Sequence, residues 1–175
     1  MNELKRQGVD CTAISGSDAL RHVIGNSDLS DFDKISEEER TNFRAQAVNY
    51  LIDLSRTRAH PLIVDGHLTL RNRETGKIEV NWNEHDQRLY SEVVVLNVDA
   101  ETILQRRLRD NRDRALNLEA VAEELDAEID AISRFIKDKP VTFIEQTELS
   151  VAASELRSVI EPKRRIKFFR IYYTI

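Results

Sequence analysis

Cysteine, proline, glycine and long apolar runs are all scarce in this sequence. Cys11 is the only cysteine among 175 residues, so the chain cannot form an internal disulfide or supply a thiolate metal site by itself. Three prolines in a composition 41% hydrophobic and 33% charged exclude a disordered chain. No run reaches the roughly 18 apolar residues that span a bilayer, and the N-terminus lacks the apolar centre of a signal peptide. We expect a cytoplasmic protein with no membrane partner.

The length and the net charge of the chain limit the number of domains and the kinds of partner that we expect. A chain of 175 residues can form one α/β domain with a substantial core and is short for two. The net charge of −5 argues against nucleic acid as a partner, although local arginine clusters can override that average.

The pattern of apolar residues predicts alternating strands and helices. Two continuous apolar runs, at 61–65 and 93–98, are typical of strands buried on both faces of a parallel sheet. Ser36 and Glu39 have the spacing of a capping box that opens a helix to about residue 56. The remaining expected elements are strands at 9–14 and 141–144, helices at 18–24, 103–108, 118–136 and 149–160, and a hairpin.

These elements predict a three-layer α/β/α fold with a mainly parallel sheet. We expect a single domain over residues 1–161, with the hairpin inserted at about 67–81. Residues 162–175 form a basic, aromatic tail that is rich in β-formers and is a candidate extra strand.

Candidate ligand-binding residues follow the expected strands, because open α/β sheets bind ligands beyond the carboxyl ends of their strands. These residues are 15–18, 65–67 and 97–99. Asp65 could bind Mg²⁺, or it could only cap the turn at Gly66. His67 could contact a phosphate, or it could be structural.

A cluster of arginines lies at 106–114, where five guanidinium groups occur within nine residues. Such a cluster suits bidentate phosphate binding during phosphoryl transfer. The alternative is an exposed helix whose arginines pair with neighbouring acids.

The segments ISEEER, LIVDGH, NVDAETILQRRLRD and NRDR follow one another in an order that resembles the archaeal-type adenylate kinases and related small P-loop kinases. The resemblance runs from Asp18 to about Gln146. It implies phosphoryl transfer from ATP to a small acceptor, with Mg²⁺ and ATP as cofactors and a nucleotide as the partner. It also implies a lid-like segment at about 106–116.

The same resemblance implies roles for individual residues. Asp65 would bind the metal and take part in catalysis, together with the lid arginines Arg107, Arg112 and Arg114. The residues implied in substrate binding are Ser17, Asp18, Arg44 and His67.

One feature of those kinases is missing from the sequence. They open with a strand that runs into G-x-x-x-x-G-K-[ST], whose backbone N–H groups and lysine hold the phosphates. None of the five glycines of this chain begins that motif, and Met1–Gly8 resembles the end of the helix that follows it. Because the loop's strand lies inside the sheet, its loss would leave buried backbone groups unpaired. We expect the tail to add a compensating strand, or to pair two chains into a homodimer at a sheet edge.

Two functions follow from these observations. The first is a nucleotide-binding protein that resembles an adenylate or nucleoside-phosphate kinase and is inactive as this chain alone. The alternative is a non-catalytic module that keeps the kinase fold for nucleotide sensing or protein interaction.

Overall fold

The computed structural model describes residues 2–25, 29, 31–110, 117–145, 148–160 and 168–173. The helices are α1 (Asn2–Arg6), α2 (Gly16–Ile24), α3 (Glu37–Arg56), α4 (Glu84–Leu89), α5 (Ala100–Asp110), α6 (Leu118–Phe135) and α7 (Leu149–Ile160), with a short 3-10 helix at Phe32–Lys34. The strands are β1 (Thr12–Ser15), β2 (Leu62–Asp65), β3 (Thr69–Arg71), β4 (Ile78–Val80), β5 (Glu92–Leu96), β6 (Val141–Ile144) and β7 (Phe168–Tyr173).

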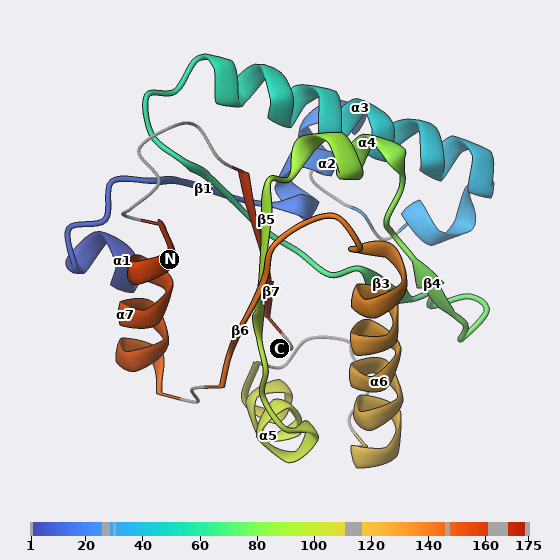
Figure 1. The fold of residues 1–175 in the computed structure, drawn as a ribbon. Helices are drawn as coiled ribbons and strands as arrows, with labels where there is room; N and C mark the ends of the chain where they lie inside the picture. The colour runs from blue at the N-terminus through green and yellow to red at the C-terminus, as the bar shows by residue number, and fades with distance from the viewer. Residues whose placement is uncertain are drawn as a thin grey trace.

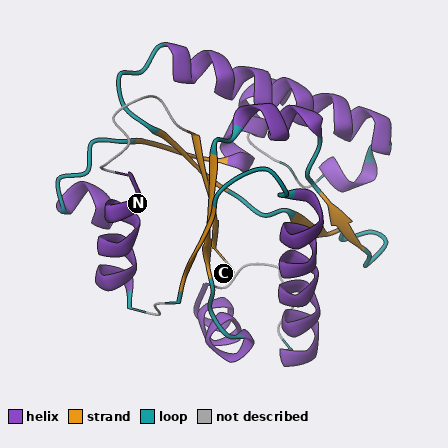
Figure 2. Cartoon of the chain, viewed as in Figure 1, coloured by secondary structure: helices purple, strands orange, loops and turns teal. Residues whose placement is uncertain are grey.

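A five-stranded parallel sheet, in the order β1-β2-β7-β5-β6, forms the centre of the protein (Figure 1). Helices pack on both of its faces, and β3 and β4 form a separate antiparallel pair beside it (Figure 2). This arrangement confirms the predicted α/β fold with a mainly parallel sheet.

The buried strands divide their side chains between two cores. Ile63, Val94 and Leu96 pack with residues of α1 and α7 on one face of the sheet. Leu62 and Val64 pack with α2, α3 and α4 on the other face, where Val93 and Val95 also contact α6. Because successive residues of a strand point to opposite faces, one apolar run supplies both cores.

Strand β7 lies in the middle of the sheet, between β2 and β5 (Figure 1). Its register places Ile171 opposite Asp65 of β2 and Val94 of β5, and both pairings are parallel. The C-terminal tail therefore supplies an interior strand, and both of its edges are paired within the chain. The predicted homodimer stays untested.

Local signals explain most of the helix ends. Ser36 accepts a hydrogen bond from the Glu39 backbone N–H while the Glu39 carboxylate accepts one from the Ser36 N–H, so the predicted capping box forms at the start of α3. Gly25 ends α2 with φ 72°, a left-handed conformation that glycine adopts without strain.

Two local expectations were wrong. Strand β1 starts at Thr12 rather than Val9, because the Val9 N–H donates to the Leu4 carbonyl in the turn that ends α1. Helix α4 was not among the expected elements, although Asn83 and Asp86 have the spacing of the capping box that forms at its start. Within the described residues, no helix has the length and apolarity needed to cross a membrane.

Candidate active site

The ends of β1 and β2 lie side by side at the carboxyl edge of the sheet. Ser15 is in register with Asp65, and a Cβ added at Gly16 would lie 3.6 Å from the Asp65 carbonyl oxygen. The structure therefore brings two of the predicted groups together, the turn that holds Ser17 and Asp18 and the segment from Asp65 to His67.

The turn after β1 is the N-terminus of α2. Ser15 is the N-cap, and its Oγ accepts a hydrogen bond of 3.0 Å from the Asp18 N–H and lies 3.0 Å from Ser17 Oγ. The Asp18 carboxylate is exposed and accepts a 2.8 Å hydrogen bond from Arg21. The hydrogen bond with Ser15, followed by the contact with Arg21, lowers the pKa of Asp18 below 3.8 and keeps this carboxylate charged.

Asp65 is the last residue of β2 and His67 lies on the short connection that leads to β3, and both residues are half-buried. The residues that follow are anchored to α6, because the backbone N–H groups of Leu68 and Thr69 donate to the Glu128 carboxylate. The third predicted group follows β5. There Asp99 accepts a 2.8 Å hydrogen bond from the Thr102 N–H and so caps the start of α5. That bond lowers the pKa of Asp99.

Arg44 lies on α3. Its guanidinium carbon lies 5.6 Å from the centre of the Phe32 ring, which is cation–π geometry. Burial lowers the pKa of Arg44, and the nearby charge of Arg40 adds to the effect. Arg40 itself is buried and donates to Glu79 and to the Asp33 carbonyl. Within the described parts of the chain, no hydrogen bond or ion pair joins the Arg44 guanidinium to a carboxylate.

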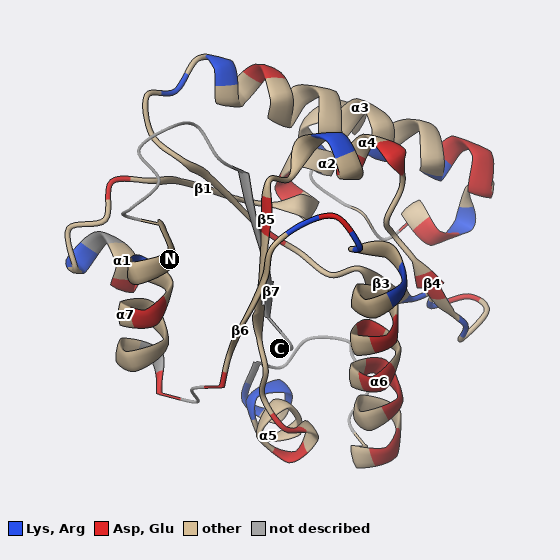
Figure 3. Ribbon diagram, in the orientation of Figure 1, with Lys and Arg blue, Asp and Glu red and all other residues tan. Residues whose placement is uncertain are grey.

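Arg107 is 9% exposed and is already bound to an acid. Its Nη1 lies 2.8 Å from Glu124 Oε2, and the other oxygen of Glu124 accepts a 2.8 Å hydrogen bond from Arg71 Nε. Figure 3 shows the acidic residues along α6 and the basic residues of α5. The catalytic role of Arg107 stays a prediction, and the predicted residues Arg112 and Arg114 lie outside the described part of the chain.

The sequence interpretation missed the acids of α6 that face the protein. Glu128 is 2% exposed, and it was not among the predicted site residues. A signal for it exists in the sequence, because Glu128 continues the three- and four-residue spacing of the apolar positions Val121, Leu125 and Ile132. An acid on an apolar stripe is expected to be buried and hydrogen-bonded.

The residues of this chain suit one of the two implied cofactors, Mg²⁺, and do not suit the other, ATP. Mg²⁺ held by a nucleotide needs only one or two protein carboxylates, and Asp65 at the strand end suits that role. Among the described residues, no cluster of three or more His, Cys, Asp or Glu is placed to hold a metal by itself. The triphosphate of ATP does not fit, because the chain contains no glycine-rich loop with a lysine to hold it.

Comparison with known proteins identifies the family. A search of curated proteins finds no match. A family model described as an AAA domain matches residues 1–123, which is more than half of the chain. Together with the parallel α/β sheet and the groups at its carboxyl edge, this match shows that the protein belongs to the P-loop-kinase-like AAA domain family and is a nucleotide-binding protein.

Proposed function

We propose that this chain binds a nucleoside monophosphate in the acceptor position of a fold related to the adenylate and nucleoside-phosphate kinases. The observation that carries the proposal is Arg44. Its guanidinium is partly desolvated against Phe32, whereas the neighbouring Arg40 is engaged by Glu79 and Asp33. An arginine held in this way can offer its planar fork to a phosphate at little cost in side-chain order.

Phosphoryl transfer from ATP is the reaction that the family resemblance implies, and we propose that this chain alone does not perform it at kinase rates. Loss of one donor to the transition state costs about 10²–10³ in kcat, and this chain lacks the loop that supplies several such donors.

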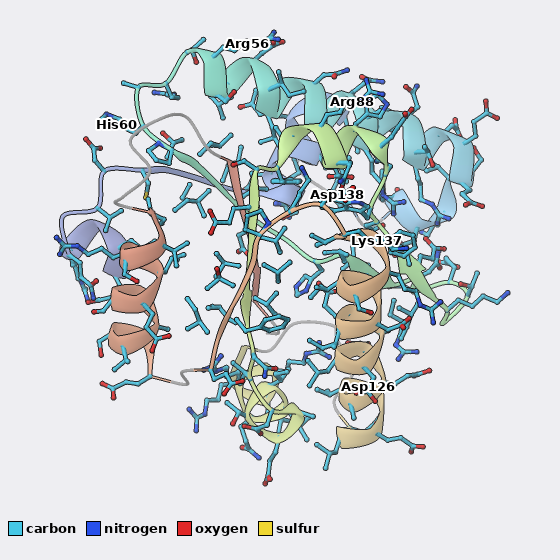
Figure 4. All side chains as sticks on the ribbon, viewed as in Figure 1. Arg56, His60, Arg88, Asp126, Lys137 and Asp138 are labelled. Atoms are coloured by element: carbon cyan, nitrogen blue, oxygen red, sulfur yellow. The ribbon has the colours of Figure 1, made fainter. Side chains whose placement is uncertain are left out.

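A calorimetric titration with AMP tests the binding proposal. Arg44→Met is expected to weaken AMP binding about 10-fold to 100-fold, since hydrogen bonds to charged groups contribute about 1.5–3 kcal/mol. Arg56→Met is the matched control, because Arg56 lies on the same helix, is exposed and pairs with Asp53 one turn away (Figure 4). Equal losses for the two variants, or no AMP binding by the wild-type chain, would contradict the proposal.

The engagement of Arg107 by Glu124 supports a second candidate, a non-catalytic module for nucleotide sensing or protein interaction. A lid arginine that stabilises phosphates during transfer has to reach them, and an ion-paired, buried arginine is not free to do so without breaking that pair. A single-turnover assay with AMP and excess enzyme over labelled ATP distinguishes residual kinase activity from nucleotide sensing. Formation of ADP supports residual kinase activity, and AMP binding without any ADP supports sensing.

A further inference from the structure

The buried carboxylate of Glu128 binds the chain immediately after the Asp65–His67 segment. It accepts three hydrogen bonds of 2.7 Å, from the Leu68 N–H, the Thr69 N–H and the Thr69 hydroxyl. These short distances are typical of charge-assisted bonds. A carboxylate that is only 2% exposed needs hydrogen-bond donors in place of water, and Leu68 and Thr69 supply three of them.

A second set of contacts joins the same two elements farther along. Arg71 of β3 donates to Glu124 and Glu123, at 2.8 Å and 2.6 Å. Its guanidinium pKa is raised by the hydrogen bonds to these two acids. Helix α6 therefore holds β3 at its beginning, through Glu128, and at its end, through Arg71.

The other side of the segment is fixed as well. Asp65 is the last residue of β2 and is paired within the sheet, and Leu68 is bound by Glu128. Only Gly66 and His67 lie between these two anchors. The backbone is therefore held on both sides of His67, by the sheet at Asp65 and by Glu128 at Leu68.

We propose that Glu128 is a positioning residue of the nucleotide site, and that it acts by holding the Asp65–His67 segment at the carboxyl edge of the sheet. The inference rests on the proposed function for its ligand, but its effect on His67 can be measured without any ligand. Residues that orient a binding group through hydrogen bonds commonly change affinity or activity about 10-fold to 100-fold when they are altered.

Glu128→Gln is the test variant, because it keeps the shape of the side chain but places an amide donor against backbone donors. We expect changed ¹H–¹³C resonances of the His67 ring, and a loss of AMP affinity of about tenfold or more. Glu128→Asp keeps a carboxylate acceptor, and we expect its His67 resonances and its AMP affinity to lie closer to those of the wild-type protein. Asp126→Asn is the matched control on the same helix, since Asp126 is exposed (Figure 4). It should change neither the His67 resonances nor the AMP affinity.

The outcomes separate the two proposals. Wild-type His67 resonances and wild-type AMP affinity in folded Glu128→Gln would overturn the inference. A wild-type chain that binds no AMP would overturn the proposed function, and the His67 resonances would still decide whether Glu128 fixes the segment. If Glu128→Gln does not fold, Thr69→Val removes only the hydroxyl donor, and unchanged His67 resonances in that variant would overturn the inference.

Discussion

At the scale of single residues, the surroundings of each carboxylate decide what it does. Asp18 is exposed at the start of α2, where its backbone N–H donates to Ser15 Oγ and its carboxylate accepts a hydrogen bond from Arg21, and its lowered pKa keeps it charged. Glu128 is buried and organises a backbone segment. Residue type alone does not distinguish a surface cap from an interior anchor, because burial and hydrogen-bond partners set the cost of the charge.

Replacement of Ser15 by alanine tests the cap of α2. Loss of an N-cap serine costs about 0.5–2 kcal/mol of stability. The pKa of Asp18 should rise toward 3.8, because the Ser15 hydroxyl contributes most to lowering it. The lowered pKa stabilises the wild-type protein above pH 3.8, and this contribution is lost as the pH falls through the folded-state value.

An NMR titration of the Asp18 carboxylate and urea unfolding at several pH values measure the two effects. Ser158→Ala is the control, because Ser158 is exposed and its hydroxyl donates only within α7, to the Glu155 carbonyl. An unchanged pKa of Asp18 in Ser15→Ala would contradict the interpretation.

At the scale of elements, an ion pair and an apolar cluster hold α5 against α6 beside the candidate site. Arg107 joins the two helices through Glu124, and an apolar cluster of Val98, Ile103 and Val121 lies between them. If the main role of Arg107 is structural, its loss should destabilise the fold.

Arg107→Met is expected to lower the free energy of unfolding by about 1.5–3 kcal/mol, because Glu124 loses a charge-assisted hydrogen bond from a buried arginine and keeps only the one from Arg71 among the bonds described. Urea denaturation measures this loss. Arg109→Met on the same helix is the control, since Arg109 is exposed, and it should change stability by less than about 0.5 kcal/mol. A stability of Arg107→Met equal to that of the control would favour a phosphate-binding role instead.

The elements themselves were largely predictable from the sequence. The runs at 61–65 and 141–144 and the helix at 149–160 carry strong local signals, and they appear as β2, β6 and α7 within one residue of the expected bounds. The ion pairs that surround the site were not predictable. Arg71 lies 53 residues before Glu124 in the chain and Arg107 lies 17 residues before it, so only the fold brings the three side chains together.

At the scale of the whole molecule, the position of β7 decides whether the sheet is complete. A sheet interrupted between β2 and β5 would leave one edge of each of these two strands unpaired, and each unsatisfied buried group costs about 1–3 kcal/mol. The β-prone sequence of the tail predicted a strand. Its place in the middle of the sheet depends on long-range pairing with β2 and β5, which local propensity does not specify.

Ile171→Pro should reduce the free energy of unfolding by about 1–3 kcal/mol or more, because proline removes a backbone donor and is poorly tolerated in an interior strand. Thermal and urea unfolding of the full chain measure the change. A loss below about 0.5 kcal/mol, as expected for an exposed tail, would contradict the interior position.

Amide hydrogen exchange of the full chain tests the position of β7 most directly. Core strands exchange only through large unfolding events, whereas free tails exchange at once. We predict that the amides of 168–173 that pair in the sheet exchange as slowly as those of β2 and β5, the two strands that flank β7. Exchange of these amides at the rate of an unstructured peptide would contradict the account.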